Sequence, residues 1–428
     1  MREMKDSGIE WIGKIPEEWT KDKAIRLFNI IGSGTTPKNI TSDFPCVNWI
    51  QSGDINGSLI SSCKNNVSES IISQYSALKI YAAPFIVIAM YGASVGNTSI
   101  SLIDGCVNQA CCVLSASIYN LNYAFYAIKS SQNYLIRKAI GGGQPNISQD
   151  TIKQLWLPLP ALHEQKRIAA FLDAECAEID AVLEKTRASI EEYKKLKQAV
   201  ITQAVTKGIR GDRPMKDSGS VWFEEIPCNW VMKRIKYLFH IKKDIAGKEG
   251  YTVLSITQSG IKPKDLSKNE GQLADNYSHY QLLNPGDFAM NHMDLLTGWV
   301  DISKYSGVTS PDYRVFVLDD TEKNDSSYYL YLMQMCYFNR IFYGLGQGVS
   351  GMGRWRLQAD KFLNFPVVVP PVDEQKEIAS YLNEKCSCIE VMIAKKQQYL
   401  IEIENYKKSL IYEYVTGKKE VKTSVLAD

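Results

Sequence analysis

A chain of 428 residues, 45% of them hydrophobic, can bury more than one core, so ordinary domain sizes predict two or three domains. Lysine and arginine (49) nearly balance aspartate and glutamate (47), and the net charge of +2 excludes the strongly basic composition of many DNA-binding proteins. The longest apolar run, residues 82–90, is far shorter than the roughly 20 residues of a membrane span, and the N-terminus lacks the apolar stretch of a secretion signal. We therefore expect a multi-domain cytoplasmic protein.

The first recognisable element, residues 5–28, returns later in the chain. It aligns without a gap with residues 216–239, at a separation of 211 and with 10 of 24 positions identical. Residues 160–182 match residues 370–392 in the same way, at a separation of 210 and with 9 of 23 positions identical. Because the two separations nearly agree, the chain is expected to consist of two copies of one structural unit.

The segments between these matches, residues 40–140 and 250–350, show only scattered similarity. Both mix short β-branched and aromatic runs with turn-rich stretches, and each contains one apolar helix candidate, at residues 119–140 and 326–343. We predict an α+β fold with two globular modules, at residues 1–162 and 208–372. The second module opens with a linker at residues 208–215.

A long helix is predicted after each module, at residues 163–207 and 373–418, and a C-terminal tail follows at residues 419–428. The first helix would have 45 residues and a length of about 65 Å, and its acidic beginning and basic end suit an antiparallel neighbour. Apolar residues recur at intervals of seven and predict a coiled coil that pairs the helices or docks a partner: Leu172, Ile179, Tyr193, Val200, Leu382, Ile389, Ile403 and Leu410.

The sequence contains no motif for catalysis or cofactor binding that the surrounding residues support. Gly346, Gly348 and Gly351 have the spacing of a dinucleotide fingerprint, but they follow a helical pattern instead of a strand. The ten cysteines form no Cys-x-x-Cys pair and the four histidines lack ligand spacing, so we expect reduced thiols and no metal site. No catalytic residue and no cofactor bound by this chain are predicted.

The repeated segments resemble the specificity subunit of type I restriction-modification systems. KDSGxxW and IPxxW open each half, Glu-Gln-Lys-x-Ile-Ala opens each long helix, and the similarity runs over essentially the whole chain. The resemblance implies an architectural frame formed by the repeated residues Trp11, Ile15, Pro16, Trp19, Trp222, Ile226, Pro227 and Trp230.

The resemblance also implies a function and partners. Each module would read one part of a split double-stranded DNA sequence, and the antiparallel helices would dock methyltransferase subunits, expected to be two. The chain itself would not be a catalyst. S-adenosylmethionine would be bound by the methyltransferase, and restriction subunits, where present, would supply cleavage driven by ATP with magnesium.

Candidate DNA-reading residues are polar or basic side chains in the turn-rich parts of the modules, because Asn and Gln can pair with adenine, and Arg or Lys with guanine. In the first module they are Thr35, Thr36, Lys38, Tyr91, Ser94, Asn97, Gln144 and Asn146. In the second module they are Lys262, Lys264, Asn291, His292, Arg314, Gln347, Arg354 and Arg356.

Two alternative functions stay open. A duplicated coiled-coil adaptor that binds only protein would explain the long helices, though not the divergent modules. A catalytic DNA methyltransferase or nuclease would need a methyl-donor pocket or a carboxylate cluster that the sequence does not display. The small net charge adds the hypothesis that the isolated chain holds DNA weakly and that its partners make much of the phosphate contact.

Overall fold

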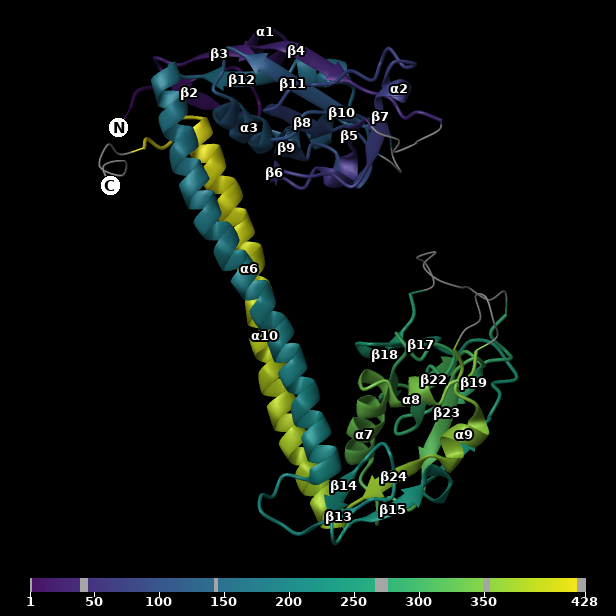
Figure 1. The fold of residues 1–428 in the computed structure, drawn as a ribbon. Helices are drawn as coiled ribbons and strands as arrows, with labels where there is room; N and C mark the ends of the chain where they lie inside the picture. The colour runs from purple at the N-terminus through teal and green to yellow at the C-terminus, as the bar shows by residue number, and fades with distance from the viewer. Residues whose placement is uncertain (1, 39–44, 142–144, 266–275, 349–354, 422–428) are drawn as a thin grey trace. The chain divides into compact units, whose positions relative to one another are not determined.

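The computed structural model describes residues 2–38, 45–141, 145–265, 276–348 and 355–421 (Figure 1). They form two compact units: Met1–Thr186 with Gln398–Asp428, and Arg187–Gln397. Each unit contains one globular module together with part of each of two long helices. Among the described residues, no helix has the length and the apolar character that a membrane span requires.

The two long helices are α6 (Leu162–Lys207) and α10 (Val372–Val415). In the first unit Leu172, near the start of α6, shares a hydrophobic cluster with Leu410, near the end of α10. In the second unit Val205, near the end of α6, shares a hydrophobic cluster with Leu382, near the start of α10. The start of each helix therefore lies beside the end of the other, which confirms the predicted antiparallel pair (Figure 1).

The contact between the helices follows the alternating three- and four-residue spacing of a coiled coil. The predicted positions, seven residues apart, make up half of this seam, and between them lie Cys176, Leu183, Ile190 and Cys386, all buried. Four of the predicted side chains are buried and four are half-buried: Leu172, Leu382, Ile389 and Leu410, and Ile179, Tyr193, Val200 and Ile403, respectively.

Two lysines related by the repeat also occupy seam positions. In the first unit the ammonium group of Lys407 lies 2.6 and 2.7 Å from the two carboxylate oxygens of Asp180. In the second unit Lys197 pairs with one carboxylate oxygen of Glu390. Because only 15% of the Lys407 side chain and 30% of the Lys197 side chain are exposed, each lysine is held between the helices.

The first module is built around a five-stranded sheet in the order β4-β11-β8-β9-β6. A three-stranded sheet, β10-β5-β7, and two-stranded pairs β1-β2 and β12-β3 complete it. Its strands are β1 (Met4–Asp6), β2 (Lys14–Pro16), β3 (Thr20–Lys23), β4 (Phe28–Ser33), β5 (Cys46–Ile50), β6 (Leu59–Ile60), β7 (Asn66–Ser68), β8 (Phe85–Ala89), β9 (Thr98–Ser101), β10 (Gly105–Val107), β11 (Cys111–Ser117) and β12 (Trp156–Leu159). Its helices are α1 (Ala24–Leu27), α2 (Glu69–Ile72), α3 (Leu121–Ser130), α4 (Gln132–Lys138) and α5 (Gln149–Lys153), with 3-10 turns η1 (Ser52–Asp54) and η2 (Gly92–Ser94).

Strand β8 explains why the apolar run at residues 82–90 belongs to a core. Successive side chains of a strand point to opposite faces of the sheet. Ile86 and Ile88 belong to the cluster that includes α3 and the long helices, whereas Phe85, Val87 and Ala89 belong to a second cluster on the other face. Both faces are covered, so every residue of β8 is buried.

The second module repeats this plan around a four-stranded sheet in the order β16-β23-β20-β21, with two-stranded pairs β13-β14, β15-β24, β17-β18 and β19-β22. Its strands are β13 (Met215–Asp217), β14 (Glu225–Pro227), β15 (Val231–Arg234), β16 (Phe239–Lys242), β17 (Leu254–Thr257), β18 (Gly260–Pro263), β19 (Gln281–Leu283), β20 (Phe288–Met290), β21 (Val300–Ile302), β22 (Gly307–Thr309), β23 (Arg314–Leu318) and β24 (Pro366–Val369). Its helices are α7 (Ser326–Phe338), α8 (Ile341–Gly344) and α9 (Ala359–Asn364), with the 3-10 turn η3 (Ile235–Tyr237).

Each predicted apolar helix is divided into two. Residues 119–140 form α3 and α4, and Ser131, with φ −80° and ψ 0°, ends the first of them. Residues 326–343 form α7 and most of α8, and Arg340 between them adopts a left-handed conformation with φ 57° and ψ 23°. Hydrophobic periodicity continued across both breaks, so the sequence pattern did not reveal them.

Candidate nucleic-acid interface

Each module is anchored to its long helix by a buried glutamate in the first turn of that helix. The indole nitrogen of Trp19 donates a hydrogen bond of 2.9 Å to Glu164, and Trp230 donates one of the same length to Glu374. An arginine pairs with the second oxygen of each carboxylate, Arg2 at 2.6 Å in the first unit and Arg213 in the second. The Arg–Trp–Glu cluster therefore fixes Trp19 in the first unit and Trp230 in the second.

A tyrosine in each module receives the end of the other long helix. Tyr123 on α3 donates its hydroxyl to the carbonyl oxygen of Val415 at 2.8 Å, near the end of α10. Tyr328 on α7 donates to the carbonyl oxygen of Val205 at 3.1 Å, near the end of α6. The last carbonyls of a helix lack partners within the helix, so these hydroxyls satisfy groups that would otherwise be buried without one.

In the first module, two loops meet where β8 ends. The backbone N–H of Ile147 donates to the carbonyl oxygen of Met90 at 2.9 Å, and that of Gly92 donates to the carbonyl of Pro145 at the same distance. Tyr91 and Asn146 form an isolated β-bridge, and both are exposed. Two candidate residues that are far apart in the sequence therefore lie together at one exposed edge of the module.

The second module brings the corresponding loops together where β20 ends. The N–H of Leu357 donates to the carbonyl oxygen of His292 at 2.9 Å, as Ile147 does to Met90 in the first module. Gln347 and Arg356 exchange two backbone hydrogen bonds, of 2.9 and 3.0 Å, and both side chains are exposed. We call residues 90–92 and 145–147 the reading loops of the first module. Those of the second module contain His292, Gln347, Arg356 and Leu357.

Two positive charges lie at the reading loops of the second module, Arg356 in the loops and Arg314 on the strand β23 beneath them. Burial, together with the charges of Arg314 and Arg356, lowers the pKa of His292 to about 4, so the imidazole is neutral at pH 7. Burial likewise lowers the pKa of Arg314 to about 10, although Tyr337 opposes this and Arg356 adds to it. An electropositive site suits the acceptor atoms of guanine and the phosphate backbone.

Arg314 corrects one expectation. It was expected in an exposed turn, but it lies on β23 and is buried. Its guanidinium group donates to the carbonyl oxygen of Leu357 at 2.9 Å and lies 5.0 Å from the centre of the Phe362 ring. An arginine engaged in this way supports the reading loop from inside the module, because its donors point to the backbone of the loop and not to solvent.

The remaining candidate residues are distributed over several elements. Asn97 is half-buried, and its side-chain oxygen accepts a hydrogen bond of 2.8 Å from Gln132, so it is held within the module. Gln144 and Arg354 lie outside the described residues. The others follow β4 (Thr35, Thr36 and Lys38), lie in η2 (Ser94), lie on or just after β18 (Lys262 and Lys264), or follow β20 (Asn291).

The sequence did not single out Trp355, which lies beside the reading loop of the second module. Its indole nitrogen donates to the carbonyl oxygen of Tyr343 at 2.6 Å, and 37% of the residue is exposed. A Cβ atom on Gly346 or Gly348 would lie 2.5 Å from this ring. These glycines of the apparent dinucleotide fingerprint therefore allow the close approach of a tryptophan, a role that their spacing alone could not reveal.

Within the described ranges, no group of three or more His, Cys, Asp or Glu side chains is arranged to hold a metal ion. All ten cysteines are free thiols.

Comparison with known proteins gives the same two-part division. The family model described as "Type I restriction modification DNA specificity domain" matches residues 16–192 and again residues 227–402. The MjaVIII specificity subunit of a type I restriction enzyme from Methanocaldococcus jannaschii is 26% identical over 315 residues, which are 70% of each chain. The putative MjaX specificity subunit from the same organism is 25% identical over 69% of this chain and 66% of its own.

Two solved structures share the fold. A chain described with complex assembly and conformational transition of the type I R-M system aligns with a TM-score of 0.69 over 95% of this chain and 99% of its own, at 14% identity. The HsdS subunit from Thermoanaerobacter tengcongensis aligns with a TM-score of 0.50 over 95% and 98%, also at 14% identity. These similarities confirm the predicted arrangement of two modules and two long helices.

Proposed function

Because the chain belongs to the family of type I restriction-modification DNA specificity subunits, we propose that its reading loops contact the bases of the two halves of a split DNA target. The chain recognises the DNA sequence, and the chain has no catalytic role within the restriction-modification complex. The modules carry the two specificity domains matched by the family model.

The observation that carries this proposal is the contrast between a repeated frame and divergent loops. Both units keep the Arg–Trp–Glu cluster and the tyrosine contact with a helix end. The reading loops share a pattern of backbone hydrogen bonds, since Asn146 exchanges two with Ile140 as Arg356 does with Gln347, but their side chains differ. A constant backbone presenting different donors and acceptors suits the recognition of two different sequences.

Two kinds of partner follow from this function. We infer that methyltransferase subunits dock on α6 and α10, that there are two of them because the helix pair repeats its surface, and that they bind S-adenosylmethionine. Restriction subunits, where present, would use ATP and magnesium. This chain then contributes sequence recognition, and its partners contribute the chemistry.

The test is to express the chain with the methyltransferase subunit of its own system and to map modified adenines across a genome. We expect one split motif, with two defined parts separated by a fixed number of unspecified bases. The chain without the methyltransferase should produce no methylation. A continuous motif, or methylation by the chain alone, would contradict the proposal.

Matched loop variants sharpen this test. Arg356→Ala should relax the second part of the motif and Asn146→Ala the first part, because loss of one good bidentate base contact costs about 1–3 kcal/mol of discrimination. Glu249→Ala serves as a control, because this exposed residue lies outside the reading loops. If each variant relaxed both parts equally, the loops would not be the separate readers that we propose.

The net charge of +2 leads to a separate expectation for the isolated chain. We expect weak DNA binding with a shallow salt dependence, and tighter, steeper binding after the methyltransferase is added, since each additional phosphate contact increases the salt dependence. Fluorescence anisotropy with a labelled duplex measures both. Full affinity and a steep salt slope for the chain alone would refute this division of the DNA contact.

A further inference from the structure

Ile140 lies directly beside the reading loops of the first module. Its backbone exchanges two hydrogen bonds with Asn146, of 2.9 and 3.1 Å. Asn146 also forms a β-bridge with Tyr91. Three short extended segments therefore lie side by side, and the middle one carries Asn146.

The side chains of these three residues share one face. Residues directly opposite each other in an antiparallel pair point to the same side, with Cα atoms about 5.5 Å apart where they exchange hydrogen bonds and about 4.5 Å apart where they do not. Ile140 is 81% exposed and Tyr91 is 39% exposed, and Asn146 is exposed as well. The row Tyr91–Asn146–Ile140 is therefore a continuous surface that a ligand can reach.

The second module forms the same backbone pairing with different side chains. Gln347 and Arg356 exchange two backbone hydrogen bonds, of 2.9 and 3.0 Å, and both residues are exposed. Gln347 therefore takes the place of Ile140, and Arg356 takes the place of Asn146. We call Ile140–Asn146 and Gln347–Arg356 the cross-strand pairs of the two modules. An aliphatic side chain in the first pair corresponds to a carboxamide in the second.

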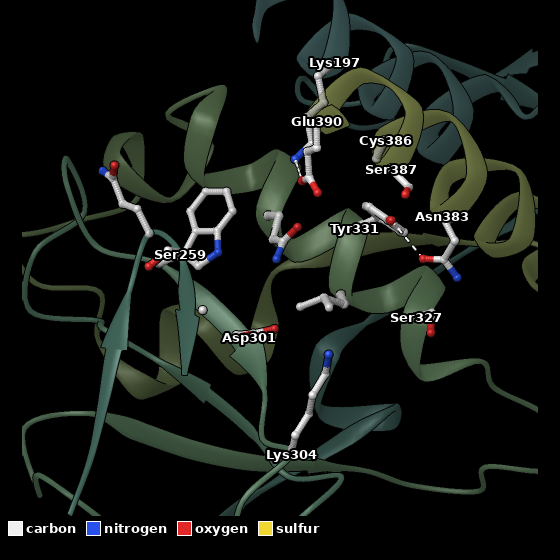
Figure 2. Close-up of a pocket in the computed structure, with 15 residues that line it drawn as sticks. Lys197, Ser259, Asp301, Lys304, Ser327, Tyr331, Asn383, Cys386, Ser387 and Glu390 are labelled. Atoms are coloured by element: carbon white, nitrogen blue, oxygen red, sulfur yellow. Dashed lines mark hydrogen bonds and ion pairs between the residues drawn. The ribbon is translucent and has the colours of Figure 1, made fainter. Parts of the chain in front are cut away.

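A separate polar cavity of about 430 Å³ lies in the second unit, with walls from α7, β21 and the long helices (Figure 2). Its lining is electrically balanced, because Lys197 and Lys304 accompany Glu390 and Asp301, and Lys197 is already paired with Glu390. Neither residue of the second cross-strand pair lines this cavity. The cavity thus favours no class of ligand, in contrast to the exposed cross-strand pairs.

The spacing of a cross-strand pair suits neighbouring base pairs. The major groove of DNA admits a two-stranded β-ribbon, and successive base pairs are stacked about 3.4 Å apart. A separation of about 5.5 Å places Ile140 one or two base pairs away from the base that Asn146 contacts. The carboxamide of Asn can form two hydrogen bonds with adenine, whereas the group in the major groove that suits an aliphatic side chain is the C5-methyl of thymine.

We propose that Ile140 packs against the methyl group of a thymine in the first part of the target, one or two base pairs from the base that Asn146 contacts. This proposal rests on the proposed function of the reading loops and adds Ile140 to them as a specificity-determining residue. Gln347 has a polar side chain at the same position, so the second module selects a base there by hydrogen bonds. One replaced residue therefore changes the kind of contact by which each half of the target is read.

Replacement of thymine by uracil removes only the methyl group and tests the proposal without altering the protein. The full chain, assembled with its methyltransferase subunit, is titrated with labelled duplexes in which each thymine of the mapped target is replaced in turn, and fluorescence anisotropy measures the affinity. At one thymine of the first part we expect a loss of about fourfold, which corresponds to roughly 0.8 kcal/mol for one buried methyl group. Equal affinities for thymine and uracil at every position of the first part would overturn the proposal.

The variant Ile140→Ala identifies the side chain that makes this contact. It should bind the thymine duplex about fourfold more weakly than the unmodified chain does, and it should bind the thymine and uracil duplexes equally well. The matched control is Ile118→Ala, because Ile118 is a 68% exposed isoleucine of the same module that lies outside the cross-strand pair. The control should keep the full preference for thymine. An undiminished preference in Ile140→Ala would assign the contact to another residue and contradict the proposal.

A second variant, Ile140→Gln, installs the residue of the second module. Mapping of modified adenines should show that the requirement for thymine is lost at one position of the first part, while the second part and the spacing are unchanged. A motif identical to that of the unmodified chain would contradict the role of Ile140.

These results separate a failure of this inference from a failure of the proposed function. A split motif whose two parts respond separately to Asn146→Ala and Arg356→Ala, together with equal affinities for thymine and uracil duplexes, would keep the reading loops and reject only the role of Ile140. A continuous motif would reject both.

Discussion

The two units share their contacts with the long helices and differ in what they present to solvent. The first unit has neutral polar reading loops with Tyr91 and Asn146. The second has arginine and histidine in and near its reading loops. Duplication preserved the groups that hold a module on its helices, while the groups available to a ligand diverged. Variants of the frame should therefore change stability, and variants of the loops should change recognition.

The largest expected difference between the units concerns the buried glutamates. Glu374→Ala should destabilise the second unit by about 3–5 kcal/mol, because it leaves a buried arginine and indole without their partner. The Glu374 side chain is 3% exposed, and the Arg213 side chain is 15% exposed. Glu164→Ala should cost the first unit less, since Arg2 is 21% exposed and keeps Glu18 as a partner at 2.9 Å.

Hydrogen exchange resolved by peptide measures this effect in each unit separately. Glu18→Ala is the control and should change little, because 54% of that side chain is exposed. An equal loss of protection in both units, or a greater loss after Glu164→Ala, would contradict the ranking.

A smaller difference should depend on pH. His292 stands where the first unit has Met90, and its folded pKa of about 4 lies below its ordinary value of 6.5. The unfolded chain then binds the proton more readily, so this contribution to stability is complete above about pH 6.5 and is lost as the pH falls towards 4. Since His292 is only half-buried, we expect a loss of only about 1 kcal/mol after allowance for solvent screening.

Chemical denaturation between pH 4 and 7 can measure this slope against His292→Met, which installs the residue of the first unit. The variant should lose the contribution of this group to the slope. An identical pH dependence in both proteins would show that His292 does not titrate as described.

The smallest expected difference lies in the seam of the long helices. Asp180→Asn should destabilise the first unit by about 0.5 kcal/mol and Glu390→Gln the second by less, because partly exposed ion pairs contribute little. Lys407 contacts both oxygens of Asp180 and is 15% exposed, whereas Lys197 is 30% exposed. Thermal unfolding of each single variant measures its effect on stability. The double variant Asp180→Lys with Lys407→Asp reverses both charges and measures the contribution of the ion pair. Failure of the reversal to recover stability would show that the ion pair itself contributes nothing.

The duplication and the long helices could be predicted because their signals are local and repeated. Apolar residues at intervals of seven identified Leu172 and Leu382, both buried in the seam. Half of the seam was missed: Leu183 and Ile190 fit an apolar pattern but belong to the intervening set of positions, and Cys176, Cys386, Lys197 and Lys407 in that set interrupt it. A polar residue can be assigned to the seam only when its partner on the opposite helix is known.

The reading site was less predictable, because it depends on contacts between distant segments. Tyr91 and Asn146 were both selected, but only the fold places them in one β-bridge. Arg314 was assigned to a turn, although its charge is accommodated within the module by a backbone carbonyl. Nothing in the sequence connects Glu164 with the indole of Trp19, which only the fold brings into hydrogen-bond contact.

The most direct test of the central claim is to exchange the first module for that of a related specificity subunit and to map methylated adenines in cells that also contain the methyltransferase. Two modules that read independently predict that one part of the split motif changes while the other part and the spacing stay the same. A change in both parts, or in neither, would contradict the assignment of one half of the target to each module.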